Sequence, residues 1–215
     1  MFELNQLYNM DCMDGMRKFP DEYFELAIVD PPYRDENQPT KTMRRKGGKM
    51  RSFGGKPDHA YFAELFRVSK NQIIWGVNNF RLFNYSGFVV WEKLTISETF
   101  TLSMAEIAYL SAGLGSTSKI FKHIPQDAAR IHPTQKPVAL YKWLLHHYAR
   151  PGDKILDTHV GSASSLVAAH SMGFTYIGFE IDTDYFAKAV ERIEIVKAQG
   201  RLFQQQTQGV QKSPE

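Results

Sequence analysis

One stretch in the last third of the chain constrains the fold more than any other. A short apolar run at residues 154–156 ends at Asp157, a turn of small residues follows, and residues 162–172 have the composition of a helix. Residues 175–179 form a second β-rich run, which ends at Glu180. Strand, turn, helix, strand and acid in this order form the layout of a nucleotide-binding crevice in a parallel α/β sheet.

The turn inside this unit favours adenosine over a dinucleotide as its ligand. Gly161 has no side chain, so the backbone can come close to a ligand there, and Glu180 stands where an acid reaches ribose hydroxyls. The complete G-x-G-x-x-G pattern is absent, so no helix N-terminus is cleared for a pyrophosphate. A βαβ crossover that binds nothing is the plainer interpretation of a single glycine turn.

Runs of the same kind recur along the chain and predict an α/β protein. Strand-like runs alternate with helix-like stretches, which favours a mostly parallel, twisted sheet with helices on both faces. We expect further strands at residues 26–29, 72–75, 88–91 and 106–110, and further helices at residues 58–69, 137–148 and 183–198. Ligands bind such sheets outside the carboxyl ends of the strands, where three acids are expected: Asp30, Asp157 and Glu180. If their strands are neighbours, one crevice holds a cofactor and a target together.

The residues directly after the run at 26–29 form a second informative feature. They are Asp30, Pro31, Pro32 and Tyr33. Each proline fixes its own φ and pushes the residue before it into an extended conformation, so a carboxylate, the Pro31 carbonyl and an aromatic ring share one rigid arc. This arc suits a planar substrate with an amino group, such as a nucleobase, whose amino hydrogens the acid and the carbonyl accept. A rigid strand exit with a solvated acid is the plainer alternative.

A basic segment follows this block. The net charge is only +3, but residues 40–57 contain no acid and several glycines. We read residues 34–57 as a basic loop that contacts DNA, because lysine and arginine supply most of the sequence-independent affinity for phosphates. The residues expected to bind DNA are Lys41, Arg44, Arg45, Lys46, Lys49 and Arg51. A solvated run of charge is the alternative.

Length and composition set the remaining limits. The chain has 215 residues and one cysteine, which fits one domain in a reducing compartment. We expect a single domain at residues 1–198 and a disordered tail at residues 199–215, which are polar. The chain shows neither a signal-peptide pattern nor a membrane-spanning run, so we expect a cytoplasmic protein. Cys12, His146 and His147 lack ligand spacing, so no metal site is expected.

Five motifs together resemble one family, the β-group of DNA amino-methyltransferases. In chain order they are residues 9–12, residues 30–33, residues 91–93, the hexapeptide at residues 132–137, which reads His-Pro-Thr-Gln-Lys-Pro, and the turn at residues 157–165. The similarity extends from about residue 5 to about residue 195. The turn departs from the family's Asp-Pro-Phe-x-Gly-Ser-Gly pattern, because Thr158 and His159 replace Pro and Phe, and Ala163 replaces the second Gly.

The resemblance implies a Rossmann-like methyltransferase fold with a circularly permuted motif order and S-adenosylmethionine as the cofactor. It implies methyl transfer to the exocyclic N6 amine of adenine in DNA, with the base flipped out of the duplex, as in restriction–modification. Residues at about 94–131 would be a short recognition segment. The catalytic residues would be Asp30, Pro31, Pro32 and Tyr33.

The same resemblance gives a cofactor site. Its expected residues are Asp11, Cys12, Asp30, Thr134, Lys136, Asp157, Thr158, Gly161, Ser162 and Glu180. Lys136 is expected to reach the methionine carboxylate of the cofactor, with a surface lysine as the plainer interpretation. His132 is expected to be a polar packing residue. Asn78 and Asn79 line either the base pocket or an ordinary turn.

Other functions stay open at this point. The nearest is the same chemistry on the N4 amine of cytosine, although the acid at Asp30 favours adenine, because the cytosine enzymes of the family more often have serine there. A non-catalytic nucleic-acid-binding relative and a dehydrogenase-like nucleotide enzyme are further alternatives, and RNA or a protein amide is less supported as a substrate. No recognisable motif identifies the target sequence or a partner nuclease, and none decides between a monomer and a homodimer.

Overall fold

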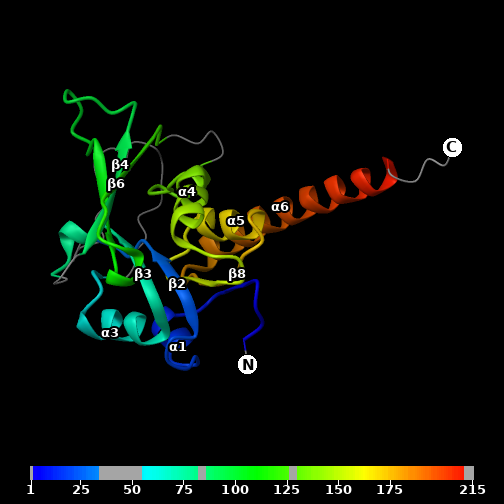
Figure 1. Ribbon diagram of the computed structural model, residues 1–215, viewed down its shortest axis with the longest axis horizontal. Coiled ribbons are helices and arrows are strands. Elements are labelled where there is room, and N and C mark those ends of the chain that lie inside the picture. Colours follow the sequence, from blue (N-terminus) through cyan, green and yellow to red (C-terminus); the bar gives the residue numbers. More distant parts are fainter. Residues whose placement is uncertain (1, 34–54, 82–85, 126–129, 211–215) are drawn as a thin grey trace.

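The computed structural model describes residues 2–33, 55–81, 86–125 and 130–210, with side chains described as far as residue 200. Within these ranges eight strands form one sheet (Figure 1). The strands are β1 (Gln6–Tyr8), β2 (Phe24–Val29), β3 (Ser69–Trp75), β4 (Gly87–Lys93), β5 (Ala105–Leu110), β6 (Lys119–His123), β7 (Lys154–Asp157) and β8 (Thr175–Phe179). The helices are α1 (Cys12–Met16), α3 (His59–Val68), α4 (Val138–Tyr148), α5 (Ser164–Ser171) and α6 (Thr183–Val210), with 3-10 turns η1 (Val77–Asn79) and η2 (Ala112–Leu114).

The sheet is mostly parallel, as predicted. Its strand order is β1-β8-β7-β2-β3-β5-β4-β6. Strand β5 runs antiparallel to its neighbours β3 and β4, while the other described pairings are parallel. The reversed strand begins where β3 and β4 end, so Glu106 near its start lies opposite Trp91 near the end of β4. An acid from β5 is thereby brought to the edge where the parallel strands end.

The central strands are apolar throughout because both faces of the sheet are covered. Ile73 and Ile74 in β3 are both fully buried, yet they belong to different apolar clusters, since successive strand residues point to opposite faces. Leu144 of α4 and Leu166 of α5 pack in the same cluster as Ile73. Leu65 of α3 packs in the same cluster as Ile74. The predicted arrangement, an α/β sheet with helices on both faces, is confirmed.

Several boundaries differ from those expected from the sequence. The prediction of a disordered tail from residue 199 is wrong for residues 199–210, because α6 continues to Val210 and extends away from the sheet (Figure 1). This stretch is rich in Gln and has no proline, so it is polar in composition but compatible with a helix. Residues 211–215 lie outside the described part of the chain.

The short strands β1 and β6 and the short helix α1 were not predicted. Two strands, β5 and β6, lie within the expected recognition segment at 94–131, so part of that segment belongs to the sheet. None of the helices in the described ranges has the length and apolar character needed to cross a membrane. We propose that residues 1–198 form one domain, since the sheet joins strands from Gln6 to Phe179.

The double-sided core predicts a large difference between two isoleucine variants. Ile73→Ala removes a fully buried side chain from β3, whereas Ile120→Ala removes one from β6 that is 59% exposed. We expect the first to lower the free energy of unfolding by about 2–5 kcal/mol and the second to change it by about 0.5 kcal/mol or less. Urea unfolding curves measure both values. Equal losses would contradict this description of the core.

Candidate active site

Three acids meet at one edge of the sheet. Asp30 follows β2, Asp157 is the last residue of β7, and Glu180 follows β8. The strands β8, β7 and β2 are consecutive in the sheet and parallel. The expectation that these strands are neighbours is therefore confirmed, and the three acids lie at one edge of the sheet.

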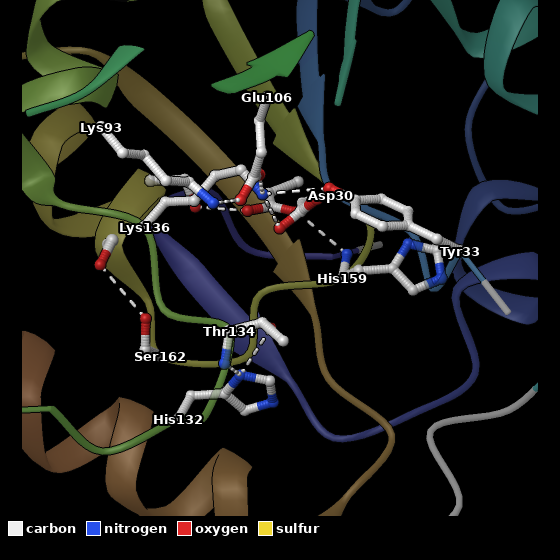
Figure 2. Close-up of polar contacts among 12 residues, drawn as sticks. Asp30, Tyr33, Lys93, Glu106, His132, Thr134, Lys136, His159 and Ser162 are labelled. Carbon is white, nitrogen blue, oxygen red and sulfur yellow. Dashed lines mark hydrogen bonds and ion pairs between the residues drawn. The ribbon is translucent and has the colours of Figure 1, made fainter. Parts of the chain in front are cut away.

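The Asp30 carboxylate is held on both of its oxygens. The Tyr33 hydroxyl donates a hydrogen bond to Oδ1, and the Lys136 ammonium donates one to Oδ2 (Figure 2). Lys136 Nζ also donates to the Tyr33 hydroxyl at 3.1 Å. Because each carboxylate oxygen accepts more than one hydrogen bond, Asp30 keeps acceptor capacity for a further donor.

Two more charges extend this contact into a row. Glu106 Oε2 lies 3.0 Å from Lys136 Nζ, and Glu106 Oε1 lies 2.6 Å from Lys93 Nζ. The charges of Asp30, Lys136, Glu106 and Lys93 alternate in sign and sum to zero. Since an unpaired buried charge is strongly unfavourable, this alternation allows the row to be largely buried, with side-chain exposures from 3% to 22%.

The two carboxylates of the row differ in pKa, because Glu106 pairs with two lysines and Asp30 with one. Burial favours the neutral form of Glu106, but Lys136 and Lys93 together lower its pKa to about 2. Asp30 shares Lys136 with Glu106, so burial prevails there and the pKa of Asp30 lies above its usual 3.8. Burial also opposes the charge of Lys136, yet the two carboxylates hold its pKa above the usual range.

Lys136 points into the protein. Its side chain is 3% exposed, which excludes the surface-lysine interpretation. Its ammonium donates hydrogen bonds to Asp30 and to the Tyr33 hydroxyl, and it forms an ion pair with Glu106. Its expected contact with a methionine carboxylate of the cofactor stays a prediction.

Tyr33 is packed against a glycine. A Cβ atom at Gly76, where φ is +71°, would lie 2.1 Å from Tyr33 Cε1, so only glycine leaves room for the ring. The ring also meets Phe80 edge-on at 6.1 Å between centroids. Asn79 donates a side-chain hydrogen bond to the Gly76 carbonyl at 3.0 Å, which fits the interpretation of this segment as an ordinary turn. Stacking of Tyr33 on a base stays a prediction.

The Asp157 carboxyl is buried at the start of the cofactor turn. Its Oδ1 accepts a hydrogen bond from the His159 amide at 3.0 Å, and Oδ2 accepts one from the Ser165 hydroxyl. Burial, together with the charges of Asp30 and Glu180, raises the pKa of Asp157 to about 7 against these hydrogen bonds. The three carboxyl groups therefore disfavour one another's charged forms.

The turn itself is anchored to Glu180. Gly161 has φ of +53°, and its amide donates to Glu180 Oε2 at 2.8 Å. The other oxygen, Oε1, accepts from the Asp182 amide at 2.8 Å. The carboxylate is thus fixed in place, and its oxygens retain lone pairs for ribose hydroxyls.

Two hydroxyl residues of the turn, both expected to bind the cofactor, face protein. Thr158 is 3% exposed, and its Oγ1 contacts the Tyr61 hydroxyl of α3 at 2.7 Å and His159 Nδ1 at 2.9 Å. Ser162 is 5% exposed, and its Oγ lies 3.2 Å from Ser164 Oγ. Both side chains hold the turn together rather than facing outward. Their expected contacts with the cofactor would have to come from the backbone.

The N-terminal motif lies beside Glu180 because β1 pairs with β8. Asn9 Nδ2 donates to the Glu180 carbonyl at 2.8 Å, and Asp11 caps α1 by accepting from the Met13 amide at 2.7 Å. Cys12 is largely buried, and burial raises the pKa of its thiol to about 12, so it stays protonated. The structure therefore places Asn9 beside Glu180, and the expected cofactor contacts of Asp11 and Cys12 stay predictions.

The residues of the hexapeptide at 132–137 lie in two different parts of the site. The His132 ring packs on Tyr185 of α6 at 4.3 Å between centroids and lies beside Gly161. Thr134 is exposed, with its Oγ1 3.1 Å from His132 Nδ1. Figure 2 shows both residues apart from the charge row, which Lys136 enters. His132 is thus a packing residue, as expected.

Sequence reasoning missed three participants in the site: Glu106, Lys93 and Tyr61. Glu106 was missed as a site residue, although a charged residue inside the otherwise apolar strand β5 was a usable signal. Tyr61, which orders the turn, gave no signal beyond apolar packing. The predicted DNA contacts all fall outside the described residues and stay predictions: Lys41, Arg44, Arg45, Lys46, Lys49 and Arg51. Across the described ranges, no group of His, Cys, Asp or Glu side chains is arranged to hold a metal ion.

Comparisons with known proteins agree with this geometry. A family model described as DNA methylase matches residues 90–191. The putative methylase YubD of Escherichia coli (strain K12) is 27% identical over 209 residues, which cover 87% of this chain and 89% of that protein.

Solved structures match over nearly the whole chain as well. A complex of M1.HpyAVI with SAM has a TM-score of 0.59 at 17% identity and covers 87% of this chain and 98% of its own. The PvuII DNA methyltransferase, described as cytosine-N4-specific, has a TM-score of 0.62 at 12% identity and covers 89% and 90%. These two structures show the Rossmann-like fold. The family model and the motifs confirm the resemblance of this chain to the DNA amino-methyltransferases of the N6-adenine and N4-cytosine type.

The burial of Asp157 predicts a stability difference that depends on pH. Its folded-state pKa of about 7 lies above the usual 3.8, so the stability that the protonated carboxyl contributes is lost as pH rises through this interval. In Asp157→Asn the amide oxygen still accepts from His159, and the amide nitrogen donates to Ser165. We expect the stability advantage of the variant to grow by up to about 4 kcal/mol between pH 4 and pH 7 and then to level off. Urea unfolding of both proteins across this range measures it, and a constant difference would contradict the assignment.

Proposed function

We propose that this protein transfers a methyl group from S-adenosylmethionine to the exocyclic N6 amine of adenine in DNA. The observation that carries the proposal is the shared edge of β2, β7 and β8, where Asp30 lies beside the turn at Asp157 and Gly161. A base-binding acid and a nucleoside-binding turn in one crevice bring an amine and a methyl donor together.

The residues of the crevice fit this cofactor. Glu180 is fixed at a strand end with free lone pairs for the ribose hydroxyls of an adenosine. The mutual repulsion of Asp30, Asp157 and Glu180 favours a cationic ligand, which would lower the raised pKa of Asp157. S-adenosylmethionine supplies a sulfonium and an ammonium charge, and its methyl group is electrophilic without help from a metal or a covalent nucleophile. The similarity to a structure solved with SAM supports the same assignment.

Asp30 and the Pro31 carbonyl would hold the acceptor amine. The nitrogen lone pair of an exocyclic amine is delocalised into the ring, and two accepted hydrogen bonds favour a pyramidal nitrogen with its lone pair free. Hydrogen bonds to a charged group contribute about 1.5–3 kcal/mol, whereas alignment of two reactants supplies about 7–11 kcal/mol. Positioning is therefore the larger contribution. Asp30 then takes up the proton that the methylated amine releases.

The base has to leave the duplex to reach this acid, because its amine is not accessible within the stack. Tyr33 would stack on the extruded base, which is worth about 1–3 kcal/mol and helps offset the unpairing. The described end of the basic loop supports DNA binding on this side, since Lys56 Nζ lies 5.7 Å from the Phe80 ring and Phe80 contacts Tyr33. A cytoplasmic setting and a role in restriction–modification belong to the same proposal, which is compatible with a monomer or a homodimer.

Methylation of the N4 amine of cytosine is the second candidate. The similarity to a cytosine-N4-specific enzyme favours it. The acid at Asp30 favours adenine, since the cytosine enzymes of the family more often have serine at this place. The two candidates share the crevice, the acceptor geometry and the cofactor, so the identity of the methylated base decides between them.

Product analysis tests the proposal. The protein is incubated with mixed-sequence DNA and S-adenosylmethionine, the DNA is digested to nucleosides, and the products are identified by mass spectrometry. We expect N6-methyldeoxyadenosine, and we expect Asp30→Ala to lower kcat by about 100-fold or more through the lost hydrogen bond and misalignment. Glu191→Ala, which removes an exposed acid on α6, is the matched control and should keep the wild-type rate.

Each other outcome has a defined meaning. N4-methyldeoxycytidine as the product would replace adenine by cytosine while leaving the proposed chemistry in place. An Asp30→Ala variant that binds the cofactor and methylates DNA at the wild-type rate would contradict the proposed role of Asp30. Wild-type protein that modifies no base in DNA would contradict the proposed activity.

A further inference from the structure

We propose that Glu106 and Lys93 act through Lys136 as positioning residues that set how readily Asp30 takes up the proton of the target amine. The proposal deepens the function given above and rests on it. Its basis is the row of four largely buried charges, in which Lys136 lies between the carboxylates of Asp30 and Glu106 (Figure 2).

Asp30 and Glu106 both pair with Lys136, but their other partners differ in charge. Glu106 faces two ammoniums, with Lys93 Nζ at 2.6 Å and Lys136 Nζ at 3.0 Å. Asp30 faces Lys136 and the neutral Tyr33 hydroxyl. Glu106 is therefore the carboxylate held in its charged form, and Asp30 is the member of the pair that accepts a proton at lower cost.

This difference matters for the proton balance of the proposed reaction. As the nitrogen–methyl bond forms, the methyl–sulfur bond breaks and its electron pair stays on sulfur. The amine then has one proton too many, and its N–H bond breaks as the proton moves to a carboxylate oxygen of Asp30. If Lys136 paired with Asp30 alone, Asp30 would be a weaker base for this step. Because Lys136 also pairs with Glu106, Asp30 stays ionised, oriented and basic.

The reversed strand β5 is what makes the arrangement possible. Lys93 is the last residue of β4, and Glu106 lies near the start of β5, so both reach the edge where β2 ends. Lys136 enters from the segment before α4, with Trp75 of β3 beneath it at 5.4 Å from the ring centroid. The charges thus come from four separate elements, and each can be neutralised without breaking a strand.

Other titratable groups lie around the row, and most do not change charge near neutral pH. Burial keeps the phenols of Tyr33, Tyr61 and Tyr141 protonated by raising each pKa well above 10. His132 lies apart from the row, and burial lowers its pKa to about 4. Asp157 on β7, with a pKa of about 7, is the exception among these neighbours. A test has to resolve Asp30 from Asp157.

Two variants that each remove one charge are expected to shift the titration midpoint of Asp30 in opposite directions. Glu106→Gln removes the competing carboxylate and leaves Lys136 to Asp30, so the titration midpoint of Asp30 should fall. Lys93→Met removes the second partner of Glu106, which then draws Lys136 away, so the midpoint of Asp30 should rise. Interaction of unit charges over such distances predicts shifts of about 1–2 pH units in each direction. A residue that only supported the fold would not produce shifts of opposite sign.

Carboxyl NMR of the full chain measures these midpoints without cofactor or DNA. Protein labelled with ¹³C at the aspartate carboxyl carbon is titrated, and the Asp30 and Asp157 signals are assigned with the Asp30→Asn and Asp157→Asn variants. The matched controls are Glu92→Gln and Lys122→Met, which break an exposed ion pair of 2.9 Å between β4 and β6. These controls should leave the Asp30 midpoint unchanged.

The kinetic counterpart is the acid limb of the pH profile of kcat. We expect it to move down in Glu106→Gln and up in Lys93→Met, with KM for DNA within about twofold of wild type, since neither side chain is proposed to touch DNA. Lys93→Arg keeps the charge and should restore the wild-type limb, and it serves as the second variant if Lys93→Met does not fold. Midpoints of Asp30 that do not move, or that move in the same direction in both variants, would overturn the proposal. Failure of the wild-type protein to methylate DNA would instead refute the proposed function, while the NMR result would still stand by itself.

Discussion

The ion pair between Asp30 and Lys136 joins two residues that are 106 positions apart in the chain, and the candidate site depends on it. Each buried ion costs several kcal/mol to desolvate, so neither charge is tolerable at this depth without the other. The end of β2 and the segment before α4 must therefore meet in the folded protein. Because Asp30 belongs to a rigid proline-containing block, this pair also fixes where an incoming amine would be held.

One reversed strand completes the electrostatic balance. A wholly parallel sheet would present only strand ends at the crevice, but β5 begins there and brings Glu106 beside Lys136. Lys93, at the end of the neighbouring β4, balances Glu106 in turn. On the other side of Asp30, the partners of Asp157 and Glu180 among the described residues are amides and a hydroxyl, not cations. The sheet edge is thus balanced in charge where the target amine would bind and acidic where a cationic cofactor would bind.

The sequence predicted the fold correctly where a local pattern, such as an apolar run followed by an acid, corresponds to a parallel strand. Acids that follow apolar runs, as Asp30 and Asp157 do, lie at one edge because parallel strands end together. The position of Lys136 was not predictable, since a lysine in a recognisable hexapeptide gives no sign of whether it points outward or into the core. The role of Glu106 required knowledge of the strand order, which no local pattern supplies. The helical extension of α6 was missed because a polar composition was taken for disorder although its residues tolerate a helix.

A double-mutant cycle on Asp30→Asn and Lys136→Met tests the central claim most directly, because it asks whether the two charges stabilise one another. Lys136→Met alone leaves Asp30 and Glu106 buried with one fewer cation and should cost about 3–5 kcal/mol in the free energy of unfolding. The double variant leaves Glu106 paired with Lys93, so we predict that it costs less than the sum of the single variants by about 1–3 kcal/mol. Additive losses, within about 0.5 kcal/mol, would show that Lys136 is not the partner of Asp30 and would contradict the account.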